Sequence, residues 1–140
     1  MTPTPPTSLI DTNIILRFIL EDIPEQSPRA RLLMRDIALD HRRTYLADTV
    51  VFETVFTLEK SYGFSRPVIR IALLGLLDLA GIVVSDRTLL EEAFQRWVEE
   101  RSLSYADSYH LSLAKHLGLA EIISFDRKLG KEPAVRRIEP

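Results

Sequence analysis

Four acidic residues lie far apart in the chain: Asp11, Glu53, Asp107 and Asp126. Three of them, all but Glu53, stand where an apolar segment ends or an expected helix begins. Asp11 comes directly after the apolar run Ser8 to Ile10, and Asp126 directly after Ile122 to Phe125. Because ligands of open α/β sheets bind at the carboxyl ends of the strands, both acids are expected at a ligand-binding edge. Carboxylate oxygens suit hard divalent cations, so the pattern predicts a metal-dependent hydrolase.

The amino-acid composition disfavours several classes of catalytic site. The 140-residue chain has no cysteine and only three histidines, which disfavours zinc and leaves neither a disulfide framework nor a thiolate nucleophile. It has no glycine-rich phosphate loop, which disfavours a nucleotide-fuelled enzyme, and no nucleophile elbow of a serine hydrolase. A hard cation held by oxygen ligands remains the best-supported centre.

The charge pattern limits how the chain could attract a polyanion. Its formal net charge is −2, so binding to nucleic acid would depend on local basic patches and on metal ions. Two patches are candidates, although a solvated surface explains each equally well. They comprise Arg29, Arg31 and Arg35 on one expected helix, and Arg127, Lys128, Lys131, Arg136 and Arg137 near the C-terminus.

No targeting or membrane segment is expected. The longest apolar stretch, residues 71–84, is interrupted by Asp78 and Gly81 and is too short to cross a bilayer of about 30 Å as a helix. Residues 1–7 lack the basic start and apolar core of a signal peptide, so we expect a flexible lead there. The absence of cysteine is compatible with a reducing cytoplasm, the location that we expect.

Strand and helix signals alternate along the chain. This alternation predicts one α/β domain over residues 8–140, with a mostly parallel central sheet of about four to five strands and helices on both faces. The expected strands are 8–10, 43–47, 82–84, 121–125 and 135–138. The expected helices are 14–20, 28–39, 48–62 with Asp48 as its N-cap, 65–81, 87–100 and 104–118.

Each acid also has a structural explanation. Asp11 satisfies free N–H groups if it caps the next helix, and Asp126 could cap a final helical turn. Ser104 and Asp107 have the spacing of a capping box. Glu53 falls opposite the apolar stripe of its helix, where a surface glutamate is the default. Asp48 and Glu59 are the alternatives if Glu53 does not take part; both stand in the same expected helix.

Taken together, the acids and their neighbours resemble the PIN domain family, in particular the VapC-type toxin ribonucleases of toxin–antitoxin pairs. The resemblance covers nearly the whole chain and lies in four blocks in a fixed order. They are Leu9-Ile10-Asp11-Thr12-Asn13-Ile14, Phe52-Glu53-Thr54-Val55 with the segment 58–66, Ser104-Tyr105-Ala106-Asp107-Ser108-Tyr109-His110, and Ile123-Ser124-Phe125-Asp126-Arg127-Lys128-Leu129.

The resemblance implies an endoribonuclease whose acidic quartet, Asp11, Glu53, Asp107 and Asp126, holds one or two Mg²⁺ or Mn²⁺ ions. It implies supporting roles for Thr12, Asn13 and Ser124, and phosphate contacts by Arg127 and Lys128. Ser124 stands where many relatives have threonine, which keeps the hydroxyl. The implied substrate is RNA, the implied inhibitor is a cognate antitoxin protein, and the implied assembly is a homodimer.

Two other functions remain open from the sequence. A PIN-like module could bind RNA or protein without catalysis, although the intact acids argue against this. An Asp-based phosphoryl-transfer domain would also place an acid at a strand end. The segment Asp11-Thr12-Asn13 lacks the second acid that such a phosphatase or receiver domain requires.

Overall fold

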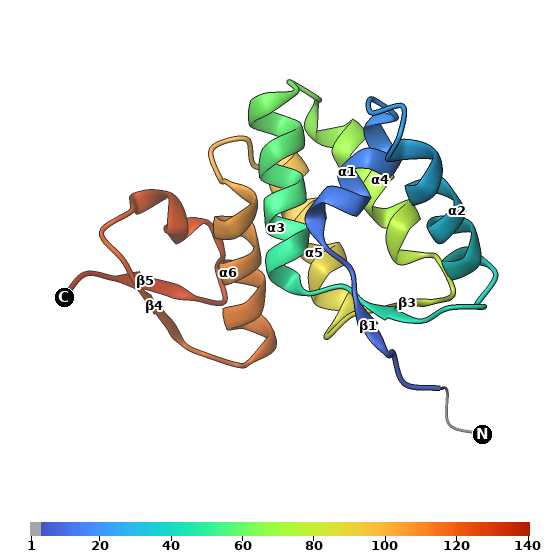
Figure 1. Ribbon diagram of the computed structural model, residues 1–140. Coiled ribbons are helices and arrows are strands. Elements are labelled where there is room, and N and C mark those ends of the chain that lie inside the picture. The colour runs from blue at the N-terminus through green and yellow to red at the C-terminus, as the bar shows by residue number, and fades with distance from the viewer. Residues whose placement is uncertain (1–3) are drawn as a thin grey trace. The chain divides into compact units, whose positions relative to one another are not determined.

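The computed structural model describes residues 4–140, which fold into two compact units (Figure 1). The first unit ends at Ser85, and the second comprises residues 86–140. Of the expected flexible lead, residues 1–3 lie outside the described part of the chain, and residues 4–7 have no regular secondary structure.

Asp11 lies just after the first strand of a parallel sheet. Its strands are β1 (Ser8–Leu9), β2 (Thr44–Tyr45) and β3 (Ile82–Val83), and they pair in the order β1-β2-β3. Hydrogen bonding continues one residue past two of these strands, with Ile10 N–H donating to Tyr45 O at 3.1 Å and Leu46 N–H donating to Val83 O at 2.8 Å. The pairing therefore fixes the backbone of the chain up to Asp11.

The helices of the first unit cover buried aliphatic side chains. They are α1 (Thr12–Leu20), α2 (Ser27–Ala38), α3 (Asp48–Phe56), the π-helical η1 (Thr57–Ser61) and α4 (Arg66–Leu77). Ile15 and Leu73, from α1 and α4, are fully buried, and Met34 and Leu58 nearly so. Amphipathic spacing had predicted these helices because buried residues recur once per turn.

The expected helix over residues 48–62 differs in two details. It is α-helical only to Phe56 and continues as a π-helical turn. Asp48 is not its N-cap: Ala47 occupies that position, and the Asp48 carboxylate instead accepts hydrogen bonds from Ser85 Oγ at 3.1 and 3.2 Å. The Asp48 side chain thus bonds to a residue that is distant in sequence.

The second unit contains α5 (Arg87–Glu99), α6 (Tyr105–His116), β4 (Glu121–Ile123), the 3₁₀ turn η2 (Arg127–Lys131) and β5 (Arg136–Ile138). The fully buried ring of Trp97 packs edge-on against Phe94 and Tyr105, with centroids 6.3 and 5.7 Å apart. Trp97 and Phe94 are therefore part of the core and do not form a base-stacking surface.

The predicted α/β class and parallel strands are confirmed. The five strands of residues 4–140 pair as one sheet of three and one of two, with β4 parallel to β5. No helix in this part of the chain has the length and apolar character that a membrane span requires.

A buried ion pair joins three segments of the second unit. Arg96 on α5 donates to Glu132 Oε2 at 2.7 Å and to Ser112 Oγ on α6 at 3.2 Å. The pKa of Glu132 lies below its ordinary range because the N–H of Ala134 donates to this carboxylate and Arg96 stands beside it, effects that outweigh burial. The charged form of Glu132 thus holds the segment after η2 in place.

Candidate metal and RNA site

Asp11 lies where the first strand ends and α1 begins. It is the N-cap of α1, with extended backbone angles, and its Oδ2 accepts from Asn13 N–H at 3.4 Å. This is a long hydrogen bond, and the residue is exposed. The capping role expected from the sequence is present, yet most of the carboxylate's capacity to accept hydrogen bonds or bind a cation remains available.

A hydrogen bond between two helices brings Glu53 to the start of α1. The buried hydroxyl of Thr12 donates to Glu53 Oε2 at 2.8 Å, which joins the first residue of α1 to the middle of α3. Glu53 is exposed, as its position opposite the apolar stripe predicted. Because Thr12 directly follows Asp11, this hydrogen bond brings Glu53 beside the residue that adjoins Asp11 in the chain.

The two alternative acids on the same helical segment have other partners. Glu59 forms an ion pair with Arg66 at 2.9 Å and lies 3.8 Å from the Lys60 ammonium. Asp48 accepts from Ser85 with both oxygens. Glu53 accepts from a neutral hydroxyl, that of Thr12, and within residues 4–140 it forms no ion pair that would offset its negative charge. Glu53 is therefore better suited to a metal ion than Glu59.

Asp107 forms the capping box that its spacing with Ser104 predicted. Ser104 Oγ accepts from Asp107 N–H at 3.0 Å, and Asp107 Oδ2 accepts from Ser104 N–H at 3.1 Å. The reciprocal bonds fix the backbone and carboxylate at the start of α6. They occupy Oδ2 and leave Oδ1 as an oriented acceptor.

Asp126 is held by the polar residue that precedes it by two positions. Its N–H donates to Ser124 Oγ at 2.9 Å, and its Oδ1 accepts from Lys128 N–H at 3.0 Å. The Lys128 ammonium lies 3.7 Å from Oδ2. Asp126 therefore caps η2, as expected, while Ser124 orients it and Lys128 partly offsets its charge.

The four acids supply oxygen donors only, which fits Mg²⁺ or Mn²⁺ better than a transition metal that prefers sulfur or imidazole. In the first unit, the hydrogen bond from Thr12 brings Glu53 beside the residue that follows Asp11, while Asp107 and Asp126 each stand at a helix start in the second. Within neither unit, over residues 4–140, do three acidic or histidine side chains gather closely enough to form a metal centre alone.

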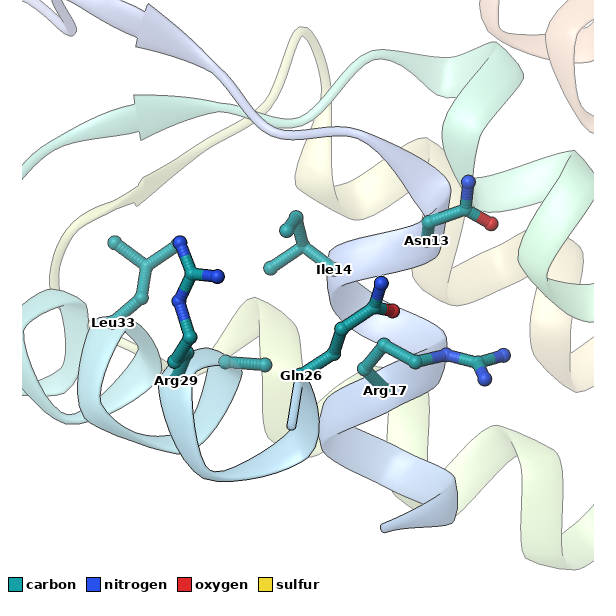
Figure 2. Close-up of a pocket in the computed structure, with 7 residues that line it drawn as sticks. Asn13, Ile14, Arg17, Gln26, Arg29 and Leu33 are labelled. Carbon is teal, nitrogen blue, oxygen red and sulfur yellow. The ribbon is translucent and has the colours of Figure 1, made fainter. Parts of the chain in front are cut away.

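The sequence did not single out a cavity in the first unit. This cavity has a volume of about 620 Å³ and is lined by residues of α1 and α2 and by Gln26, which directly precedes α2. Figure 2 shows the side chains of Arg29 and Gln26 beside it. In the sequence, Arg29 is notable only as part of the basic patch on one expected helix. Asn13 and Ile14 stand in the first family block, whereas Gln26, Ala30 and Leu33 belong to no motif, so no local signal identified these three residues.

Comparison with known proteins places these residues in a family. The PIN domain family model matches residues 8–132, which include all four acids. A VapC ribonuclease of Mycobacterium bovis and ribonuclease VapC13 of Mycobacterium tuberculosis are each 24% identical to this chain over 133 residues, covering 93% of it and 98% of each relative. The resemblance inferred from the four sequence blocks is thereby confirmed. The chain belongs to the PIN domain family.

Proposed function

We propose that this chain is a metal-dependent endoribonuclease of the VapC type, the toxin of a toxin–antitoxin pair. Support comes from the family match and from two relatives whose names are those of VapC ribonucleases. The match runs through both compact units, so we propose that residues 8–140 act as one functional domain. The observation that carries the proposal is the Thr12 to Glu53 hydrogen bond, which joins two of the four family blocks.

We assign the four carboxylates of Asp11, Glu53, Asp107 and Asp126 to the binding of one or two divalent cations. Bound Mg²⁺ or Mn²⁺ would make water a stronger nucleophile at neutral pH and would stabilise charge on the reacting phosphate. Thr12 contributes by fixing the rotamer of Glu53, and Ser124 by fixing the backbone of Asp126.

RNA contact is assigned to the cations beside the last acid. Arg127 is exposed and no ion pair of it is recorded within residues 4–140, so its charge is available to a phosphate. Lys128 already lies near Asp126, and it would divide its charge between that carboxylate and the RNA. Two other members of the basic C-terminal patch are engaged, because Arg136 pairs with Glu121 and Arg137 with Glu139.

The test is cleavage of a single-stranded RNA of mixed sequence by the full chain. We expect cuts that depend on added Mg²⁺ or Mn²⁺, stop in EDTA and leave 5′-phosphates. RNA that is bound but not cut with both metals would instead favour a binding module without catalysis.

Glu53→Gln tests the assignment that the sequence supported least. The substitution keeps the acceptor for Thr12 but removes the negative charge, so we expect cleavage to fall at least roughly 100-fold at saturating RNA. Glu59→Gln is the matched control, since it removes a charge six positions away whose partners are Arg66 and Lys60. Equal activity of the Glu53 variant and the wild type would remove Glu53 from the site.

We also propose a homodimer and binding of a cognate antitoxin. Exposed aliphatic side chains on α4 support an interface, with Val68 51% and Ile71 72% exposed. Ile71→Asp would place a charge on that surface without altering the core, so we expect weaker self-association. Light scattering checks this across a range of concentrations; a wild-type protein that is monomeric throughout would refute the dimer.

A further inference from the structure

The cavity between α1 and α2 combines apolar and polar walls. Ile14 on α1 faces Leu33 on α2, and the side chain of Arg29 rises beside them (Figure 2). Its volume of about 620 Å³ lies within the range of about 300–1,000 Å³ typical of small-ligand sites. A flat, partly apolar group with an attached anion would match these walls.

The cavity favours an anion. Two arginines line it, and none of the described residues around it is acidic. Arg17 is committed to Asp22 at 3.0 Å, and its guanidinium points away from Arg29 in Figure 2. Arg29 is exposed, and no ion pair of it is recorded in the described part of the chain. In a chain of net charge −2, this cation is therefore available for an external anion.

Two amide side chains provide groups that could read a base edge. Asn13 comes from α1, and Gln26 is the N-cap residue of α2, although its side chain makes no capping hydrogen bond. Neither side chain has a recorded hydrogen bond to another residue within 4–140. In Figure 2 the Gln26 amide points toward α1. An amide offers both donors and an acceptor, the combination needed to pair with the edge of a nucleobase.

A second cavity connects this region to the proposed reaction site. It has a volume of about 210 Å³, shares Ile14 and Leu33 with the first cavity, and is lined by Asp11 as well. A strand of RNA with one phosphate near Asp11 would thus have a neighbouring nucleotide within reach of the larger cavity.

From these observations we propose that the cavity is a nucleotide subsite: it binds one unpaired RNA nucleotide next to the cleaved bond. Ile14 and Leu33 pack against the base, Asn13 and Gln26 contact its edge, and Arg29 binds its phosphate. The inference rests on the proposed ribonuclease function, because it names where part of that substrate lies.

The test measures binding of a fluorescent single-stranded RNA hexamer to the full chain in EDTA. Arg29→Gln should weaken binding about five- to tenfold and should reduce the salt dependence by about 0.7 in the slope of log affinity against log salt. Arg35→Gln is the matched control, because it removes another exposed cation from the same helix outside the cavity. It should stay within about twofold of wild type.

A hexamer lacking one base tests the apolar wall. If one base enters the cavity, an abasic nucleotide at the best position should weaken binding to the wild type about fivefold. Equal effects of the Arg29 and Arg35 substitutions, or no effect of any abasic position, would overturn the subsite. So would displacement of the RNA by a hexaglutamate peptide at lower concentration than unlabelled hexamer, since this would assign the cavity to an acidic protein segment.

Binding in EDTA also separates this proposal from the ribonuclease function. If the wild type cleaves RNA but Arg29→Gln binds it normally, the subsite is wrong and the function stands. If the Arg29 effects appear but no metal supports cleavage, the function is wrong and the nucleotide site stands.

Discussion

Asp107→Asn is expected to lower metal-dependent RNA cleavage at least roughly 100-fold while the chain remains folded. The substitution removes a charged oxygen ligand but retains a side-chain oxygen that can accept from Ser104 N–H. The capping box would weaken by less than about 1 kcal/mol, so loss of folding cannot explain the loss of activity. Initial cleavage rates at saturating Mg²⁺, with a thermal melt of the same sample, measure both effects.

Asp86→Asn is the matched control for that experiment. Asp86 is likewise an aspartate that caps a helix start of the second unit with its side chain: it is the N-cap of α5, and its Oδ1 accepts from Leu89 N–H at 3.0 Å. Asparagine caps nearly as well as aspartate, so this variant should cleave within about twofold of wild type. A parallel loss in both variants, or full activity of Asp107→Asn, would mean that Asp107 has only a capping role.

Gly81→Ala should destabilise the first unit by about 3 kcal/mol. A Cβ at this position would collide with the carbonyl oxygen of Arg42 and lie 2.8 Å from that of Ile37. Both are backbone atoms, and Gly81 cannot move away easily, because its N–H donates to Ile37 O and its own carbonyl accepts from Thr44 N–H, each at 2.9 Å. The strain would therefore pass into β2 and its pairing.

Gly75→Ala, on a neighbouring segment, is expected to raise the stability of the first unit. Gly75 lies on an exposed position of α4, and a Cβ there meets nothing within 4 Å. Alanine should stabilise this helix by about 1 kcal/mol, since glycine is a poor helix former. Denaturant unfolding of the two variants checks both signs. If Gly81→Ala were as stable as Gly75→Ala, the close approach of Gly81 to the backbone would be wrong.

Local signals were enough to predict most elements of the fold. Gly63 and Gly118, with φ of 69° and 68°, end helical segments where the sequence placed helix stops. The capping box of Ser104 and Asp107 also depends on only four consecutive residues, so its spacing sufficed. These features are local, because each is determined by a few neighbouring residues in the sequence.

Features that depend on distant partners could not be predicted in the same way. The helical wheel put Glu53 on the surface, which is correct, but it could not show that Thr12 would reach it from another helix. Asp48 was predicted as an N-cap, but Ala47 takes that position, and the Asp48 carboxylate accepts from Ser85, which lies far along the chain. The division of five strands into two sheets likewise depends on pairing between distant segments, and periodicity carries no such information.

Residues that matter only because they line a cavity could not be identified from the sequence either. Gln26 and Leu33 belong to no motif, and their types are ordinary for a helix surface. They became candidates only when the structure placed them beside Ile14 and Arg29 around one cavity. Such sites follow from the packing of two helices, so a single sequence does not reveal them.

The central claim is that four carboxylates bind the cation that drives RNA cleavage. A crystal structure of the full chain soaked in Mn²⁺, with the metal located by anomalous scattering, tests it most directly. We predict one or two Mn²⁺ ions whose protein ligands include Asp11, Glu53, Asp107 and Asp126. Mn²⁺ bound at other residues, or full occupancy with Asp11 and Asp107 outside the coordination shell, would contradict the account.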